Sequence, residues 1–178
     1  MYEFYVGTTP KDPPGNIVKV CLDSDGQLVD KSYYEAVSPA YLCRKGSCIY
    51  AVIENADFGG VQVLDVNKNG SLTAKARLDT EDVYSTYISA EKRGNRIFVA
   101  NYGTPSCAVY RYEAEKLVQE SVLREKKTEK SHIHCAALTP EEAYVCLVDV
   151  GTDEILVYAA DSLELVDTVE FPEGSGPR

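Results

Sequence analysis

The fold is decided by a short apolar segment that occurs three times, as Tyr50-Ala51-Val52-Ile53, Phe98-Val99-Ala100-Asn101 and Cys146-Leu147-Val148-Asp149. The segments begin at residues 50, 98 and 146, so 48 residues separate each start from the next. A fixed interval of this size indicates a repeat architecture, in which each unit buries its apolar face against its neighbours.

Each segment belongs to a unit of four strand-like stretches. One stretch precedes the segment, an alternating run follows it, and a fourth stretch begins near residues 71, 116 and 164. The preceding stretches are residues 41–42, 86–89 and 134–138. The alternating runs are residues 61–66, 108–112 and 155–158. Four short strands per unit, without helical periodicity, are typical of a propeller blade. The sequence therefore predicts an all-β fold, a β-propeller of four-stranded antiparallel blades.

The repeat makes the whole chain, residues 1–178, one partial propeller. In the first unit, residues 4–6 match the second strand, residues 17–22 the third, and the fourth begins at Leu28 after an Asp25-Gly26 hairpin turn. We expect three strands of a first blade, three complete blades and the start of a fifth, at residues 1–37, 38–83, 84–130, 131–173 and 174–178. Such a chain ends before a propeller closes, and we expect it to expose apolar blade faces.

Charge and composition argue against several classes of partner. The chain carries 18 basic and 28 acidic residues, a formal charge of −10, which disfavours DNA, RNA and anionic membranes as partners. No apolar run approaches the roughly 18 residues of a membrane helix. Residues 1–7 show neither the basic stretch nor the apolar core of a secretion signal. We therefore expect a cytoplasmic protein that binds neither nucleic acid nor membrane.

The six cysteines are expected to be free thiols. Cys21, Cys48, Cys107 and Cys146 lie in apolar, strand-like runs, where free Cys behaves as a small buried apolar residue. Cys43 and Cys48 lack the C-x2-C spacing of a zinc site. A disulfide or a metal role for these cysteines is the alternative.

Five segments resemble successive landmarks of the lactonase family, in order along the chain. They are Tyr5-Val6-Gly7-Thr8, Ile49-Tyr50-Ala51-Val52 with Glu54, Val99-Ala100-Asn101-Tyr102-Gly103, Asp149-Val150-Gly151-Thr152-Asp153 and Gly174-Ser175-Gly176-Pro177-Arg178. The resemblance implies a seven-bladed propeller, of which about half is present here. Bacterial members of the family hydrolyse 6-phospho-D-glucono-1,5-lactone in the pentose phosphate pathway. A fungal relative instead cyclises carboxymuconate, so the resemblance leaves the substrate open.

His134 is the strongest candidate for catalysis. Opening a δ-lactone requires an activated water, a donor to the developing oxyanion and, for a phosphorylated substrate, a cationic seat. His134 aligns with Thr86 and Ala40 at the start of an innermost strand, near one mouth of the central channel. The resemblance implies a functional His at this position. We expect His134 to act as general base or to orient the water; the alternative is a channel His bonded to a neighbouring blade.

His132 precedes the same strand and is a weaker candidate, for substrate binding. The sequence His132-Ile133-His134-Cys135 could also bind a metal. No carboxylate lies close in sequence, however, and the lactonases that the chain resembles are not known to depend on a metal. We expect neither a metal nor a cofactor.

The remaining candidates are one arginine and four residues at the ends of second strands. Arg178 matches the Arg of the family's Gly-Pro-Arg-His segment, and an arginine can grip phosphate or carboxylate through two hydrogen bonds. The candidates for substrate binding are Glu54, Asn101, Tyr102 and Asp149. The alternative for Asp149, Asn101 and Tyr102 is a role in the turn that follows the strand.

The predicted function is hydrolysis of a sugar lactone, with 6-phospho-D-glucono-1,5-lactone as substrate and 6-phosphogluconate as product. The alternatives are a non-catalytic propeller that serves as a binding platform and an enzyme like carboxymuconate cyclase. The family's later acid and second His would lie beyond residue 178, so we expect this chain to be inactive alone. The expected partners are the phosphorylated lactone and either the missing half or a second copy, which would cover the open blade faces.

Overall fold

The structure is a computed structural model that describes residues 1–9, 15–124 and 128–178. These residues form strands, turns and connecting loops, and none of them lies in a helix. The predicted all-β fold is therefore confirmed. No helix in this described part of the chain is long and apolar enough to cross a membrane.

The strands in the described residues form four antiparallel sheets that follow one another in chain order. The first sheet contains β1 (Tyr2–Gly7), β2 (Gly15–Leu22) and β3 (Leu28–Ala36). The second contains β4 (Leu42–Lys45), β5 (Cys48–Val52), β6 (Gly59–Val66) and β7 (Leu72–Thr80). The third contains β8 (Ser85–Ala90), β9 (Arg96–Asn101), β10 (Ser106–Glu113) and β11 (Lys116–Leu123). The fourth contains β12 (Ile133–Leu138), β13 (Tyr144–Asp149), β14 (Glu154–Ala159) and β15 (Leu165–Glu170).

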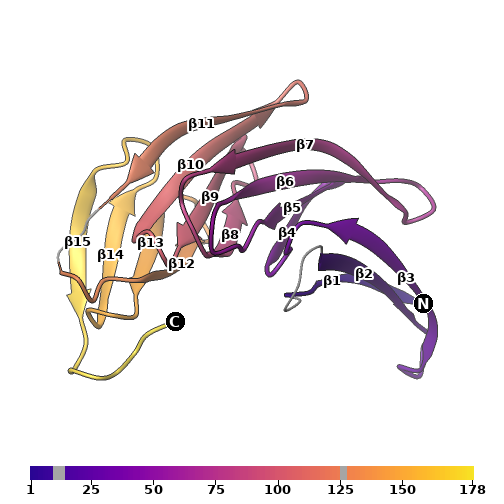
Figure 1. Cartoon of the computed structure of the whole chain (residues 1–178), viewed down its shortest axis with the longest axis horizontal. Helices are drawn as coiled ribbons and strands as arrows, with labels where there is room; N and C mark the ends of the chain where they lie inside the picture. The colour runs from indigo at the N-terminus through magenta and orange to yellow at the C-terminus, as the bar shows by residue number, and fades with distance from the viewer. Residues whose placement is uncertain (10–14, 125–127) are drawn as a thin grey trace.

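The sheets are arranged along an arc, as blades around a common axis (Figure 1). The first strand of each four-stranded sheet, β4, β8 or β12, lies on the concave side, and the last strand, β7, β11 or β15, lies outside. The second strands begin at Cys48, Arg96 and Tyr144, which preserves the interval of 48 residues. The predicted four-stranded antiparallel blades are thus present in three of the four sheets.

The core lies between successive sheets, because a strand presents alternate side chains to its two faces. In β9, Ile97 and Val99 pack towards the second sheet, in a cluster that includes Tyr50 and Val63. The intervening Phe98 and Ala100 pack towards the fourth sheet, in a cluster that includes Leu147, Leu156 and Tyr158. Both faces of β9 are therefore buried, which is why this strand is continuously apolar from Ile97 to Ala100.

Polar side chains on the inner strand tie the third blade to the fourth. The hydroxyl of Ser89 donates to the carbonyl of Ala136 at 2.7 Å, and the hydroxyl of Thr86 donates to the carbonyl of His134 at 3.2 Å. At the other end of the sheet, the guanidinium of Arg96 pairs with Glu91 and donates to the carbonyl of Ala160 at 2.6 Å. The bonds from Ser89 and Thr86 fix the position of β12 along the direction of β8.

We expect Val109→Ala to lower the free energy of unfolding by about 2 kcal/mol, because Val109 is fully buried between the third and fourth sheets and loses two packed methyl groups. Val118→Ala is the matched control: the same change on the outer strand β11, where the side chain is 49% exposed, should cost less than about 0.5 kcal/mol. Urea unfolding followed by circular dichroism measures both. Equal losses would contradict packing between sheets as the source of stability.

Candidate functional site

An open pocket of about 440 Å³ lies at the mouth formed by the starts of the inner strands. Its lining comes from the second, third and fourth sheets and from the C-terminal segment. The lining residues are Glu54, Tyr84, Thr86, Tyr102, His134 and Arg178. Four of these, Glu54, Tyr102, His134 and Arg178, are among the residues predicted from the sequence, and the structure brings them together.

One backbone contact, present in each of the three four-stranded blades, follows the second strand and helps to place Glu54 and Tyr102. The N–H of Glu54, just after β5, donates to the carbonyl of Ser38 at 3.0 Å. At the equivalent position after β9, the N–H of Tyr102 donates to the carbonyl of Tyr84 at 2.9 Å. Val150 after β13 makes the same bond to His132 at 3.1 Å. In three blades, a hydrogen bond at an equivalent position thus joins the residue after the second strand to the segment that precedes the inner strand.

Tyr102 contacts the rings of both histidines. The ring of His132 stacks flat on that of Tyr102, with centroids 4.2 Å apart and an interplanar angle of 6°. The ring of His134 meets Tyr102 edge to face, with centroids 6.1 Å apart and an angle of 89°. His134 lines the pocket and is half-buried. His132 is not among the residues that line the pocket, and it contacts Tyr102 by stacking.

The tautomer of His132 follows from its partner. Its Nδ1 lies 2.9 Å from the carbonyl oxygen of Tyr102. A carbonyl oxygen only accepts hydrogen bonds, so Nδ1 carries the proton. This bond and the stacking both hold Tyr102 in place.

Asn101 and Asp149 are not brought to the pocket. Asn101 is fully buried; its Oδ1 accepts from the hydroxyl of Ser85 at 2.7 Å, and its Nδ2 donates to the hydroxyl of Ser106 at 2.9 Å. The two residues occupy equivalent positions at the ends of β9 and β13, one residue before the fastened N–H. The geometry gives both side chains a structural role in the turn, the alternative that the sequence had left open.

The carboxylate of Asp149 organises the turn that follows β13. It accepts from the N–H of His132 at 2.8 Å, from the N–H of Gly151 at 2.9 Å and from the hydroxyl of Ser131. Gly151 is required at this point because a Cβ there would overlap the carbonyl oxygen of Lys130. Buried carboxylates are tolerated only when such donors satisfy them.

Tyr84 and Thr86 were not predicted from the sequence as lining residues. Thr86 aligns with His134 in the repeat, which is the signal that could have identified it. Tyr84 adopts φ = +53°, a left-handed backbone conformation that is rare for a bulky residue. It is held there by the bond from Tyr102 and by its own N–H, which donates to the carbonyl of Asn55 at 2.9 Å. A strained residue at a pocket is a pattern associated with function.

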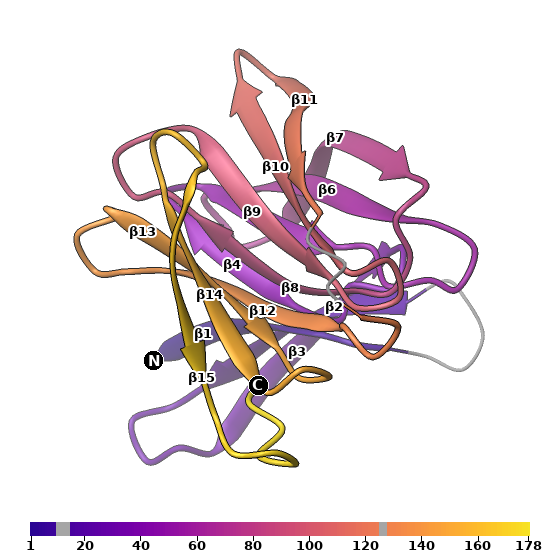
Figure 2. The ribbon, with the colours of Figure 1, turned by 90° about the vertical axis from the view of Figure 1, so that its left-hand side faces the viewer.

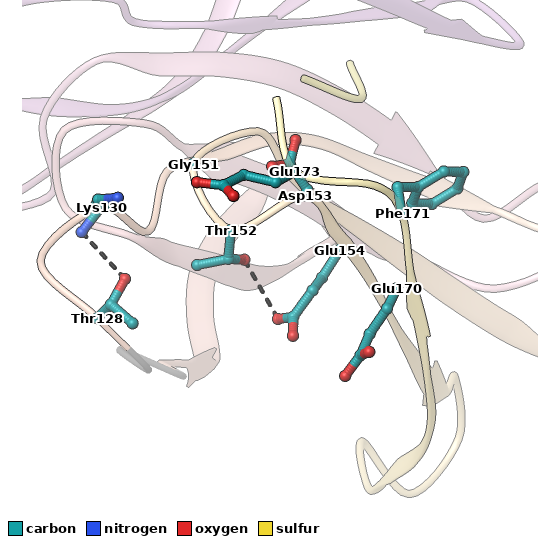
Figure 3. A pocket seen from close by; sticks show the side chains of 9 residues that line it. All are labelled: Thr128, Lys130, Gly151, Thr152, Asp153, Glu154, Glu170, Phe171 and Glu173. Atoms are coloured by element: carbon teal, nitrogen blue, oxygen red, sulfur yellow. Dashed lines mark hydrogen bonds between the residues drawn. The ribbon is translucent and has the colours of Figure 1, made fainter. Parts of the chain in front are cut away.

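A second pocket, of about 370 Å³, lies at the turn after β13 and is acidic (Figure 3). Asp153, Glu154, Glu170 and Glu173 line it together with Lys130. None of the residues predicted for catalysis or binding belongs to it. Within residues 1–9, 15–124 and 128–178, no group of three or more His, Cys, Asp or Glu side chains is arranged to hold a metal ion.

The pocket with His134 combines groups that can move protons and bind anions. An imidazole, a carboxylate and a guanidinium come from three different parts of the chain, and two tyrosines add hydroxyl donors. An imidazole can take a proton from water near neutral pH. A guanidinium can neutralise an oxyanion or bind phosphate. The arrangement can therefore bind a small polar anion and activate water beside it.

Comparison with known proteins agrees with this architecture. Residues 3–178 match the family described as "Lactonase, 7-bladed beta-propeller". The chain is 30% identical to an uncharacterized protein of Staphylococcus saprophyticus and 29% identical to the 6-phosphogluconolactonase of Bacillus subtilis, over 98% and 99% of its length. In both cases the match covers 55% of the relative, so the chain spans about half the length of these curated relatives.

A solved structure has the same fold. The periplasmic gluconolactonase PpgL of Pseudomonas aeruginosa superposes with a TM-score of 0.84 at 23% sequence identity. The match covers 99% of this chain and 57% of that one.

We expect Asp149→Asn to lower the free energy of unfolding by about 2 kcal/mol or more, because the new amide group presents an NH2 to donors that need an acceptor. Glu54→Gln is the matched change in the pocket, where the side chain is half-buried, and it should cost less than about 0.5 kcal/mol. Urea unfolding compares the two variants. If Asp149→Asn were as mild as Glu54→Gln, the structural role of Asp149 would be wrong.

Proposed function

Because the chain belongs to the lactonase family of seven-bladed β-propellers, we propose that the whole protein hydrolyses a sugar lactone, with 6-phospho-D-glucono-1,5-lactone as substrate. The observation that carries the proposal is the pocket in which His134 and Arg178 come together with Glu54 and Tyr102. The name of the Bacillus subtilis relative supports the choice of substrate.

In the proposed mechanism, His134 acts as the general base. It takes a proton from water while the water oxygen bonds to the lactone carbonyl carbon. The carbonyl becomes an oxyanion, and its collapse breaks the bond between that carbon and the ring oxygen. His134 then returns the proton to the departing ring oxygen, which becomes the hydroxyl of the open-chain acid. No group is oxidised or reduced, and the protein is regenerated.

Arg178 supplies the positive charge in this proposal. The chain as a whole has a formal charge of −10, so an anionic substrate needs a local cation at the site. A guanidinium suits a phosphate because two parallel N–H groups can meet two oxygens. Tyr102 and Glu54 line the pocket, and in this proposal they hydrogen-bond hydroxyl groups of the sugar while the stacked His132 keeps the Tyr102 ring in position.

We also propose that further blades, or a second copy of the chain, cover the outermost sheets in the whole protein. The exposed large apolar side chains include Phe4 and Val6 on β1 and Val166 and Val169 on β15. Figure 2 looks onto the fourth sheet, with β14 and β15 towards the viewer. The relatives, almost twice as long as this chain, support additional blades as the cover.

A cytoplasmic location is part of the same proposal. All six cysteines are free thiols in the structure, which fits a reducing compartment.

In the intact protein, we expect hydrolysis of 6-phosphogluconolactone above the spontaneous rate, unaffected by a metal chelator. His134→Asn should lower kcat by about 10²- to 10⁴-fold, since it removes the proton acceptor. His132→Asn is the matched control and should cost about tenfold or less, because His132 acts only through Tyr102. Titration of the released acid measures the rate. An unchanged rate in His134→Asn, or no lactonase activity at all, would sink the assignment in favour of a binding platform.

We expect Arg178→Ala to raise KM for the phosphorylated lactone by about tenfold or more, with little effect on glucono-1,5-lactone, if the guanidinium binds phosphate. An oxyanion donor would instead affect both substrates through kcat. Arg77→Ala is the control: Arg77 pairs with Asp79 on the outer strand β7 and should leave both substrates unaffected. Steady-state kinetics on the two lactones separate these outcomes. Unaltered KM and kcat for both lactones in Arg178→Ala would show that Arg178 does not contact the substrate.

A further inference from the structure

The segment after β15 returns from the outer edge of the fourth sheet to the concave side of the arc, where the C-terminus lies (Figure 1). It carries Arg178 to the pocket without forming a strand of its own. A residue on such a segment holds its position only if other contacts fix the backbone. One residue, Asp153, makes several of these contacts.

Asp153 provides three anchors for this segment. Its carbonyl oxygen accepts from the N–H of Phe171 at 2.8 Å. One carboxylate oxygen accepts from the N–H of Gly174 at 2.8 Å, and the other accepts from the N–H of Gly176 at 2.7 Å. The last of these bonds lies two residues from Arg178. Figure 3 shows Asp153 among the side chains of the acidic pocket, where it lies with Glu173 and Phe171.

The backbone of the segment is shaped to make these bonds. Gly174 adopts φ = +80° and Gly176 adopts φ = +55°, conformations that glycine takes at little cost. Between them, the N–H and the hydroxyl of Ser175 donate to the carbonyl of Pro172 at 3.1 and 2.6 Å. The result is a tight turn in which the N–H groups of Gly174 and Gly176 both donate to the carboxylate of Asp153.

The electrostatics agree with the geometry. The N–H groups of Gly176 and Gly174 stabilise the charged carboxylate and lower the pKa of Asp153 from its ordinary value. Asp153 itself adopts φ = +57°, which Asp tolerates better than most residues. Asp153 is therefore ionised at neutral pH, as an acceptor of two N–H bonds must be to hold them most strongly.

We propose that Asp153 is a positioning residue, whose carboxylate holds the segment of residues 174–178 so that Arg178 stands at the pocket beside His134. The functional part of this inference rests on the proposed binding of a phosphorylated lactone by Arg178. Asp153 touches no substrate. It acts on binding only through the place that it gives to the guanidinium.

The kinetic test uses the intact protein and both lactones. Asp153→Ala should raise KM for 6-phosphogluconolactone by about tenfold, as Arg178→Ala does, and leave glucono-1,5-lactone unchanged. Asp153→Asn keeps one acceptor oxygen and should fall between Asp153→Ala and the unaltered protein. Asp23→Ala is the matched control, because Asp23 also accepts two backbone N–H groups, from Asp25 at 2.9 Å and Gln27 at 2.8 Å, in a hairpin of the first sheet. An equal rise in KM in Asp23→Ala would overturn the inference.

A double-mutant cycle separates positioning from a general loss of structure. If Asp153 acts through Arg178, then Asp153→Ala should cause no further rise in KM once Arg178 is Ala. Multiplicative effects of the two changes would show that they act independently and would overturn the proposal.

A third measurement is independent of catalysis. In the intact protein labelled with 15N-glycine, Asp153→Asn and Asp153→Ala should lower the heteronuclear NOE of Gly174 and Gly176, while Gly26 keeps its value. Unchanged values at Gly174 and Gly176 would refute the anchoring role, whether or not the protein is a lactonase. Lower values in a protein without lactonase activity would support the anchor and reject the proposed function.

Discussion

Successive sheets pack against one another through apolar side chains, and a single strand can contribute side chains to the packing with both neighbouring sheets. In β9, Ile97 and Val99 face one sheet while Phe98 and Ala100 face the other. A one-residue slip of this strand would exchange the two sets and place each against the wrong partner. The packing therefore fixes the register of the strand, and the register fixes where the strand ends. The positions of the mouth residues that lie at the ends of strands follow from this constraint.

The backbone hydrogen bond after the second strand determines where the next residues lie relative to the pocket. Glu54 and Tyr102 are delivered to one mouth because their N–H groups are fastened to Ser38 and Tyr84 in the same way. The chemistry of the pocket is then a matter of which side chain each blade carries at an equivalent position. His134 and Arg178 complete the pocket from the fourth sheet and from the segment that leaves it.

The repeat in the sequence was sufficient to predict the blades, because 48-residue spacing and strand alternation depend on local pattern. It also predicted His134 near one mouth and gave Tyr102 as a candidate for substrate binding at the end of a second strand. The repeat could not predict which of the adjacent residues Asn101 and Tyr102 faces the pocket. The alternation of side chains along a strand ends where the turn begins, and the turn decides their directions. Tyr84 was missed because its left-handed backbone is imposed by contacts with Asn55 and Tyr102. The anchoring by Asp153 depends on a contact with residues 21 and 23 positions further along the chain.

The bonds that fasten Glu54, Tyr102 and Val150 use only backbone atoms. The bonds therefore require only a backbone N–H, which every residue except proline supplies, and a side chain that fits the space. An evolving gene could exchange a carboxylate, a phenol or an isopropyl group at any of them and retain the same scaffold. One point mutation per repeat would then change the ligand, which is how an array of duplicated units can acquire new specificities without a new fold.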